Sequence, residues 1–240
     1  MSDSDFHEAL DHWGRLLEAI AVFQADVAHA PVVGGTASAL HAGHRFSMDA
    51  DYVLDDLADG ERFQSFVDFL EARDDWETHS INYGKLILGN FRGVDTGIRQ
   101  LIRQEPLETE WLETARGPVR VPTAAEMLRI KGWLCLIRNT QRDYIDLAAL
   151  SDHLGDEAVA EALRRFDACY KDVDSRHRER DTMPSVQLSW QLADPHPKDY
   201  DERNYAGLKA KWQDWDRVYG VCRQVATLLA EIEQQSPRTL

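Results

Sequence analysis

The sequence predicts an α+β fold, in which a small mixed β-sheet core flanked by helices is followed by a mostly helical C-terminal part. Two observations lead to this prediction. Between residues 31 and 121, short apolar or alternating runs are separated by glycine turns, which is typical of strands. After residue 122, apolar residues recur every three or four positions, which is typical of amphipathic helices. We therefore expect one part over residues 1–121, with an N-terminal helix, and a second over 122–240.

The elements of the first part follow in chain order. Apolar residues spaced by three and four predict a helix over 5–28 that packs on the sheet, and Pro31 then starts the first strand. The further elements expected are a helix over 36–42, a strand over 49–54, a helix over 59–73, two strands within 76–88 joined at Gly84, a strand over 94–102 and a short last strand over 117–121.

The second part is expected to be a series of helices. They cover 127–138, 142 to near Gly155, 156–173 and Tyr205 to about Gln234. Asn139 and Thr140 separate the first two helices. The stretch 172–197 is polar, and we expect it to be irregular.

The composition favours a cytoplasmic protein with no membrane span. The 240 residues are enough to bury a proper hydrophobic core, and no run approaches the ~20 apolar residues that cross a bilayer. The N-terminus, Met1–Asp5, is acidic and unlike a signal peptide. The three cysteines are scattered without the spacing of a metal site, which fits a reducing compartment.

The charge is unevenly distributed. The net charge is −15, which argues against a general nucleic-acid-coating protein. Residues 91–142 nevertheless carry nine basic and six acidic side chains, and the segments on either side are acidic. This basic segment could hold a triphosphate or a nucleic-acid end, or its arginines could simply be solvated. The acidic remainder could equally meet a basic protein partner.

The stretch from Gly34 to Asp51 has the pattern of a nucleotide site. Two glycines and a hydroxyl precede a short helix, so backbone N–H groups and the helix dipole could approach a phosphate. Asp49 and Asp51 follow in a strand, where residues two apart point to one face and lie about 6–7 Å apart. Two such carboxylates repel each other unless a cation lies between them, and Mg²⁺ accepts carboxylate and phosphate oxygens together. The pattern predicts metal-assisted phosphoryl or nucleotidyl transfer, whereas the alternative is a tight turn with an exposed acidic strand end.

This stretch resembles the nucleotidyltransferase signature of the DNA polymerase β-like superfamily. More narrowly it is similar to the AbiEii toxin family, whose members carry Gly-Gly-Thr-Ala, then Gly-His-Arg, a serine and Asp-x-Asp. The resemblance implies that Asp49 and Asp51 hold Mg²⁺. It also implies that the phosphates are cradled by Gly34, Gly35 and Thr36.

Three further residues near this stretch are left open. Arg45 and Ser47 either touch phosphate or lock the turn. Asp95 is the one plausible third carboxylate on a following strand, although in the AbiEii family that position is not reliably acidic.

A second group of residues matches the same family. AbiEii-like proteins have a lysine on one helix, then an arginine, then Arg-Asp-x-x-Asp opening the next helix, and here the counterparts are Lys131, Arg138, Arg142, Asp143 and Asp146. The resemblance implies that Lys131 offsets triphosphate charge, with Asp143 and Asp146 as catalytic or organising carboxylates. Alternatively, Lys131 extends to solvent, Asp143 favours its helix N-terminus, and Asp146 pairs with a nearby arginine.

The resemblance implies a Mg²⁺-dependent nucleotidyltransferase with its nucleotide in a cleft between the two parts. It would be the toxin of a toxin–antitoxin system with a cognate antitoxin protein, moving a nucleoside monophosphate from a nucleoside triphosphate to an acceptor. For the related MenT toxins the acceptor is the 3′ end of transfer RNA, which is the first candidate here. The alternatives are transfer to a small molecule or a protein hydroxyl, and a non-catalytic module that binds nucleotide or a partner.

Overall fold

The chain folds into two compact units, each built mainly from one half of the sequence. The computed structural model describes residues 3–174, 179–199 and 205–235. The sheet unit consists of Met1–Leu40, Arg45–Ile102 and Pro106–Thr123. The helical unit consists of Ala124–Leu240 together with two short segments from the first half of the chain, His41–His44 and Arg103–Glu105.

The sheet unit contains a five-stranded mixed sheet of order β1-β2-β5-β4-β3 and a separate hairpin of β6 and β7. Its strands are β1 (Val32–Val33), β2 (Asp49–Leu54), β3 (Trp76–Asn82), β4 (Leu86–Phe91), β5 (Val94–Gln100), β6 (Thr109–Thr114) and β7 (Gly117–Pro122). Its helices are α1 (Asp3–Asp26), α3 (Gly60–Glu71) and most of α2 (Gly34–Ala42). β2 and β5 are parallel, whereas β1, β4 and β3 each pair antiparallel to a neighbour. The predicted small mixed sheet is confirmed.

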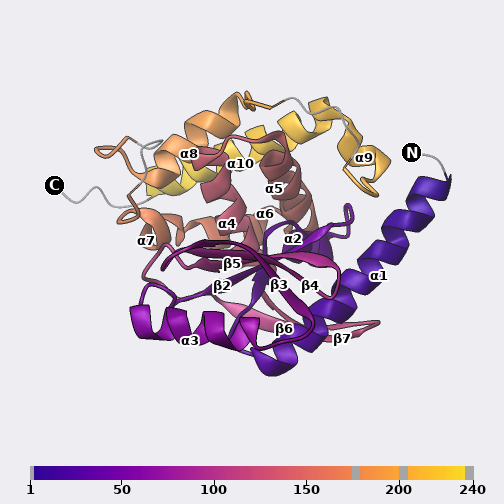
Figure 1. Ribbon diagram of the computed structural model, residues 1–240. Helices are drawn as coiled ribbons and strands as arrows, with labels where there is room; N and C mark the ends of the chain where they lie inside the picture. Colours follow the sequence, from indigo (N-terminus) through magenta and orange to yellow (C-terminus); the bar gives the residue numbers. More distant parts are fainter. Residues whose placement is uncertain (1–2, 175–178, 200–204, 236–240) are drawn as a thin grey trace. The chain divides into compact units, whose positions relative to one another are not determined.

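Burial alternates along the central strands, so the sheet has two different faces. Along β2 the residues Ala50, Tyr52 and Leu54 are buried and the residues between them are half-buried. α1 and α3 lie on one side of the sheet (Figure 1), and Phe23 of α1 packs on Tyr52 with ring centroids 4.5 Å apart. Asp49, Asp51 and Val53 therefore belong to the face that these helices do not cover.

The N-terminal helix contributes to the core over only part of its length. Leu16, Ile20 and Phe23 are buried, but Phe6 and Leu10 are 42% and 45% exposed. The sequence pattern had placed all of them on one inward face. Near its end, Gln24 bonds both the backbone N–H and the carbonyl of Arg120 on β7, so α1 also anchors the hairpin.

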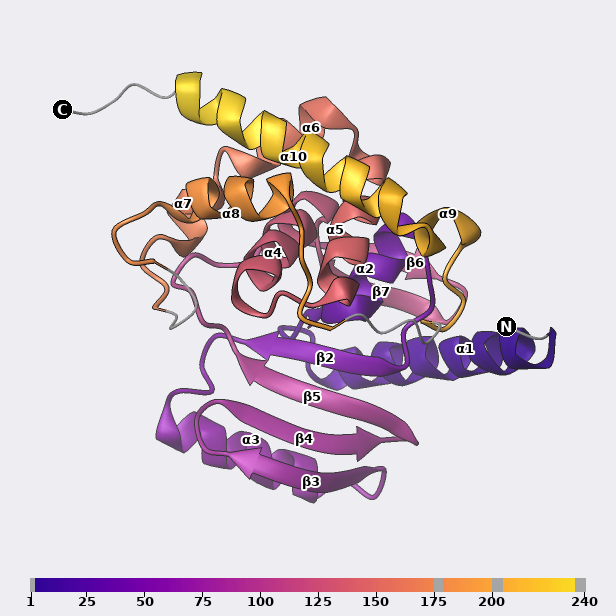
Figure 2. The same cartoon turned by 90° about the horizontal axis from the view of Figure 1, so that it is seen from above.

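The helical unit is a bundle of helices. It contains α4 (Ala124–Ile137), α5 (Gln141–Leu154), α6 (Asp156–Leu163), α7 (Phe166–Tyr170), α8 (Pro184–Ala193), α9 (Ala210–Gln213) and α10 (Trp215–Gln235). α4 packs on α5, α6 and α8, and the long α10 crosses α5, α6 and α8 (Figure 2). The mostly helical second half is thus confirmed.

Several expected elements differ from the structure. The stretch expected to be irregular contains α8, whose first residue, Pro184, is a common helix-starting residue because its missing N–H is not needed there. The helix expected over 156–173 is two helices, and the last helix begins only at Trp215, after the short α9. β6 was not expected, because four of its six residues are polar and none of the six is buried. Among the described residues, no helix is long and apolar enough to cross a membrane.

Candidate active site

The two glycines of the motif start α2, and other residues of the sheet unit use the space that their missing side chains leave. Gly34 has a φ of +69°, and a Cβ added there would lie 3.3 Å from Oδ2 of Asp51. A Cβ on Gly35 would lie 2.4 Å from Nη2 of Arg45. A side chain at Gly34 would be strained by the positive φ, and one at Gly35 would require Arg45 to move. The first N–H groups of a helix have no partner within the helix, so this turn also offers donors to an anion.

Asp49 and Asp51 lie on the same face of β2, two residues apart. Ser47 Oγ donates a hydrogen bond of 3.0 Å to Oδ1 of Asp49. Oδ1 of Asp51 lies 3.3 Å from Nε of Arg99 on β5, within an ion pair whose side chains are 27% and 41% exposed. Both carboxylates are thus oriented by neighbours and remain within reach of solvent.

The neighbouring strand β5 completes the surface around the aspartates. In the parallel register, Asp95 pairs with Asp49 and Gly97 pairs with Asp51. A Cβ on Gly97 would lie only 2.4 Å from Oδ1 of Asp51, so the carboxylate occupies the place of a side chain. Asp95 is exposed and accepts a hydrogen bond from Asn90 of β4. A third carboxylate therefore lies beside the pair, on the same face of the sheet.

The remaining motif residues of the sheet unit are directed inward. Thr36 is 1% exposed, and its hydroxyl donates a 2.6 Å hydrogen bond to the backbone carbonyl of Asp49. Arg45 is 3% exposed and donates to the carbonyl of Phe46, while Ser47 is fully buried. In the described structure these three side chains brace the segment that carries Asp49.

The second predicted group forms a buried ionic cluster in the helical unit. Nζ of Lys131 on α4 lies 3.0 Å from Oδ1 of Asp143 and 2.7 Å from Oδ2 of Asp146, both on α5. Nε2 of His44 lies 2.7 Å from Oδ1 of Asp146, and Thr140 Oγ1 donates to Oδ2 of Asp143. The four ionisable side chains are at most 3% exposed. We call Lys131, Asp143, Asp146 and His44 the lysine cluster.

Pairing explains why these charges can be buried at all. An isolated ammonium or carboxylate is strongly disfavoured in a protein interior, whereas one that is paired and hydrogen-bonded is tolerated. Lys131 does not extend to solvent, and the partners of Asp146 include Lys131 and His44. Nearby, burial and the charge of Asp143 raise the pKa of the Cys135 thiol, which therefore stays neutral.

The donors on the sheet fit a hard divalent cation. Carboxylate oxygens are the ligands that Mg²⁺ prefers, and it is commonly held by one or two of them together with substrate phosphates and water. Because Gly34 and Gly97 have no side chains, neither residue places a Cβ against the oxygens of Asp51. Among the described residues, no three His, Cys, Asp or Glu side chains converge as a complete metal site.

Sequence reasoning assigned no role to His44, Gly97 or Arg99. His44 is part of the Gly-His-Arg motif, but its partner lies 102 residues away. Gly97 and Arg99 follow Asp95 at intervals of two, so the alternation of the predicted strand already placed all three on one face. That spacing could have grouped Gly97 and Arg99 with Asp95, but their place beside Asp51 follows only from the strand register.

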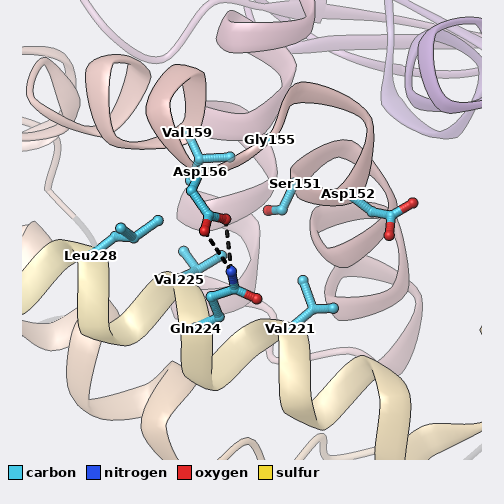
Figure 3. A pocket seen from close by; sticks show the side chains of 9 residues that line it. All are labelled: Ser151, Asp152, Gly155, Asp156, Val159, Val221, Gln224, Val225 and Leu228. Atoms are coloured by element: carbon cyan, nitrogen blue, oxygen red, sulfur yellow. Dashed lines mark hydrogen bonds between the residues drawn. The ribbon is translucent and has the colours of Figure 1, made fainter.

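A pocket of about 200 Å³ in the helical unit is formed by other residues (Figure 3). It lies among α5, α6 and α10, and none of the predicted site residues lines it. Both carboxylate oxygens of Asp156 accept a hydrogen bond from the side-chain amide of Gln224. Asp152 forms ion pairs with Lys211 and Arg217. Its acidic groups already have partners, so the pocket is not our candidate for the reaction.

Comparison with known proteins assigns the family. A family model described as "Nucleotidyl transferase AbiEii toxin, Type IV TA system" matches residues 15–220. The chain therefore belongs to the AbiEii family of nucleotidyltransferase toxins, and it is a nucleotidyltransferase. The resemblance found in the motifs is confirmed.

Curated relatives match only part of the chain. The "Mycolic acid-containing lipids exporter MmpL11" of Mycolicibacterium smegmatis is 33% identical over 138 residues, which is 57% of this chain and 14% of that protein. The "Heme uptake protein MmpL11" of Mycobacterium tuberculosis is 36% identical over 131 residues, or 54% of this chain and 13% of that protein. The chain thus spans a small fraction of these relatives, and their transport activities are not assigned to it.

Solved structures with a similar chain path have low identity. An H. pylori protein proposed to be a nucleotidyltransferase has 17% identity and a TM-score of 0.48, covering 98% of this chain and 99% of that one. An antigenic nucleotidyltransferase-like protein of Paracoccidioides brasiliensis has 16% identity and a TM-score of 0.42, covering 66% and 88%.

Proposed function

We propose that this protein transfers a nucleoside monophosphate from a nucleoside triphosphate to the 3′ end of an RNA, with transfer RNA as the first candidate, and releases pyrophosphate. The reaction would require Mg²⁺. The observation that supports this most is the pair of carboxylates on one face of β2, with Gly34 and Gly97 in place of side chains beside them. The basic composition of residues 91–142 supports an anionic acceptor.

The proposed roles on the sheet follow from the contacts. Asp49, oriented by Ser47, and Asp51 would hold the metal. The bound ion would neutralise charge on the phosphates and align the transferred group. The backbone N–H groups that start α2 at Gly34 and Gly35 would receive phosphate oxygens. Thr36 and Arg45 would act indirectly by bracing the turn.

The lysine cluster is proposed to present one oriented ammonium. Lys131 remains our candidate for offsetting triphosphate charge. Asp143 and Asp146 hold its Nζ at 3.0 and 2.7 Å, so their proposed role is to position Lys131. Lys131→Arg would keep the positive charge but replace the compact ammonium with a larger planar guanidinium. We expect this variant to lose most of the transfer activity.

Family membership also supports a biological setting. We propose that the activity arrests growth of the host cell and that a cognate antitoxin protein restrains it. The net charge of −15 favours a basic antitoxin if the two proteins bind directly. The same charge favours a second candidate acceptor, a cationic small molecule or a basic protein hydroxyl.

A labelling experiment separates these acceptors. The purified protein is incubated with Mg²⁺, each of the four nucleoside triphosphates labelled at the α-phosphate, and total RNA, total protein or aminoglycosides. We expect label at an RNA 3′ end. Label on protein or on a small molecule would instead support the second candidate.

Two variants test the proposed metal ligands. Asp51→Ala should lower the transfer rate by roughly 10²–10³-fold, because a catalytic metal contributes several kcal/mol. Asp55→Ala is the matched control, since Asp55 is an exposed aspartate that follows the same strand. Full activity of Asp51→Ala would refute the metal assignment. A large loss of thermal stability in that variant would show a structural role.

A further inference from the structure

We propose that Arg99 is a substrate-binding residue that pairs with Asp51 only until a metal ion arrives. Once the ion holds Asp51, the guanidinium turns to the phosphates of the incoming nucleotide. This inference rests on the function proposed above and adds a residue to its site. It is drawn from four features of the sheet unit: the register of two strands, one ion pair, one glycine and the exposure of one side chain.

The strand register places Arg99 beside the carboxylate. In the parallel pairing of β2 and β5, Asp51 lies opposite Gly97 and Val53 lies opposite Arg99. Arg99 therefore lies on the same face of the sheet as Asp51. It is on the neighbouring strand, two residues beyond Gly97, the partner of Asp51. Because Gly97 has no side chain, the arginine can lie back along its strand and reach Asp51, with Nε 3.3 Å from Oδ1.

The ion pair between Arg99 and Asp51 differs from the ion pairs of Asp75, which have a structural role. In the same unit, Asp75 is held by both Arg73 and Arg92 at 3.0 and 2.8 Å, and these two residues tie the segment after α3 to the turn between β4 and β5. Arg99 makes a single, longer contact from Nε. Across residues 3–174, 179–199 and 205–235, Asp51 is the one hydrogen-bond partner of its guanidinium. Its side chain is 41% exposed.

Electrostatics makes Arg99 and a metal ion compete for Asp51. Without a metal, Arg99 compensates one of two carboxylates that would otherwise repel each other. A divalent cation binds carboxylate oxygens at about 2.0–2.1 Å, and two positive charges sharing one oxygen repel each other. Metal binding should therefore loosen the guanidinium. It would then lie next to arriving phosphate oxygens, which arginine binds through two parallel hydrogen bonds.

The proposal predicts two effects of opposite sign, which a purely structural arginine would not produce. Removing Arg99 takes away a cation that competes for Oδ1 of Asp51, so the metal should bind more tightly. The same change removes a phosphate ligand, so a triphosphate should bind less tightly when the metal is present. A residue with a purely structural role would not change the two affinities in opposite directions.

The test measures binding and does not depend on turnover. Mn²⁺ is titrated into the wild-type protein and into Arg99→Ala, and free Mn²⁺ is followed by its paramagnetic resonance signal. Inorganic triphosphate is then titrated calorimetrically at saturating Mn²⁺. We expect Arg99→Ala to bind Mn²⁺ roughly two- to fivefold more tightly, the range for loss of an exposed ion pair. We expect it to bind triphosphate about tenfold or more weakly, the range for a charged hydrogen bond.

Two further variants serve as controls. Arg92→Ala removes an arginine of the same unit that is 45% exposed and also paired with an aspartate, and it should change neither affinity. Arg99→Lys keeps the charge and should recover part of the triphosphate binding. If wild type binds Mn²⁺ but Arg99→Ala leaves both affinities unchanged or lowers both, the role of Arg99 is refuted alone. If wild type binds no Mn²⁺, the proposed metal site is refuted as well.

Discussion

His44 and Asp146 lie 102 residues apart in the sequence, yet their side chains meet at 2.7 Å and both are fully buried. Asp146 gives its other oxygen to Lys131. The loop after α2 is thereby fixed to α5 within one compact unit. The Gly-His-Arg motif thus contributes to two units: His44 belongs to the helical unit and Arg45 to the sheet unit.

We predict that His44→Ala lowers the free energy of unfolding by about 2–4 kcal/mol, because a buried carboxylate loses one of its partners. His44→Gln can still place an N–H donor near Asp146 and should recover part of this loss. Urea unfolding measures both variants. His196→Ala is the control, because that histidine forms the same kind of pair, with Asp194, on the surface. Equal effects at the two sites would contradict the structural role of His44.

A second prediction concerns Gly97. Alanine there would put a Cβ 2.4 Å from Oδ1 of Asp51, so the carboxylate must move. We expect Gly97→Ala to reduce transfer at least about tenfold, since small displacements of a catalytic group are costly, and to weaken Mn²⁺ binding. Gly220→Ala on α10 meets no atom within 4 Å and should leave transfer unchanged. An active Gly97→Ala with unaltered Mn²⁺ affinity would show that the position of Asp51 does not matter.

A third prediction concerns a buried charge triad in the helical unit. Glu126 binds Nη1 of Arg103 and Nη2 of Arg129, each at 2.8 Å, and all three side chains are buried. Glu126→Gln should cost about 3–5 kcal/mol, because two buried guanidinium groups lose their counter-charge. Glu161→Gln removes an exposed glutamate that faces Arg164 and should have little effect. Chemical denaturation of both variants checks this difference.

The fourth prediction is a loss of stability at alkaline pH. Burial raises the pKa of the Cys222 thiol from about 9 to about 12 and raises the pKa of Tyr52 and Tyr170 as well. The fold therefore favours the neutral groups, whereas in the unfolded chain they ionise from about pH 9 upward. Stability should be complete below about pH 9 and decline as the pH rises toward 12. Urea unfolding between pH 7 and about 10.5 measures it, and Cys222→Ala should show a shallower decline.

Local patterns were sufficient for much of the fold. The alternation around Asp49 and Asp51 placed both on one face of a strand, and β2 has that arrangement. The expected glycine turn at Gly84 joins β3 and β4, and Gly84 has a positive φ. These features depend on residues that are neighbours in the sequence. The alternation of side chains along a strand and the residue types of a turn therefore determine them.

Features that depend on distant partners were not accessible in the same way. Arg129 lies one helical turn from Glu126, but nothing near Glu126 indicates that Arg103 will share its carboxylate, and nothing near His44 points to Asp146. β6 was missed because a hairpin strand with a mostly solvated surface has no apolar alternation to recognise. The role of Gly97 follows only from the register of β5 against β2, which the sequence of either strand does not specify.

The assignment of His41–His44 and Arg103–Glu105 to the helical unit limits how the chain can be divided. A fragment starting at Ala124 would contain Asp146 without its histidine and Glu126 without one of its arginines. Such a fragment should be poorly folded when produced alone. Split-protein complementation, with both halves co-expressed, is therefore better suited than isolated truncations to studying the two units separately.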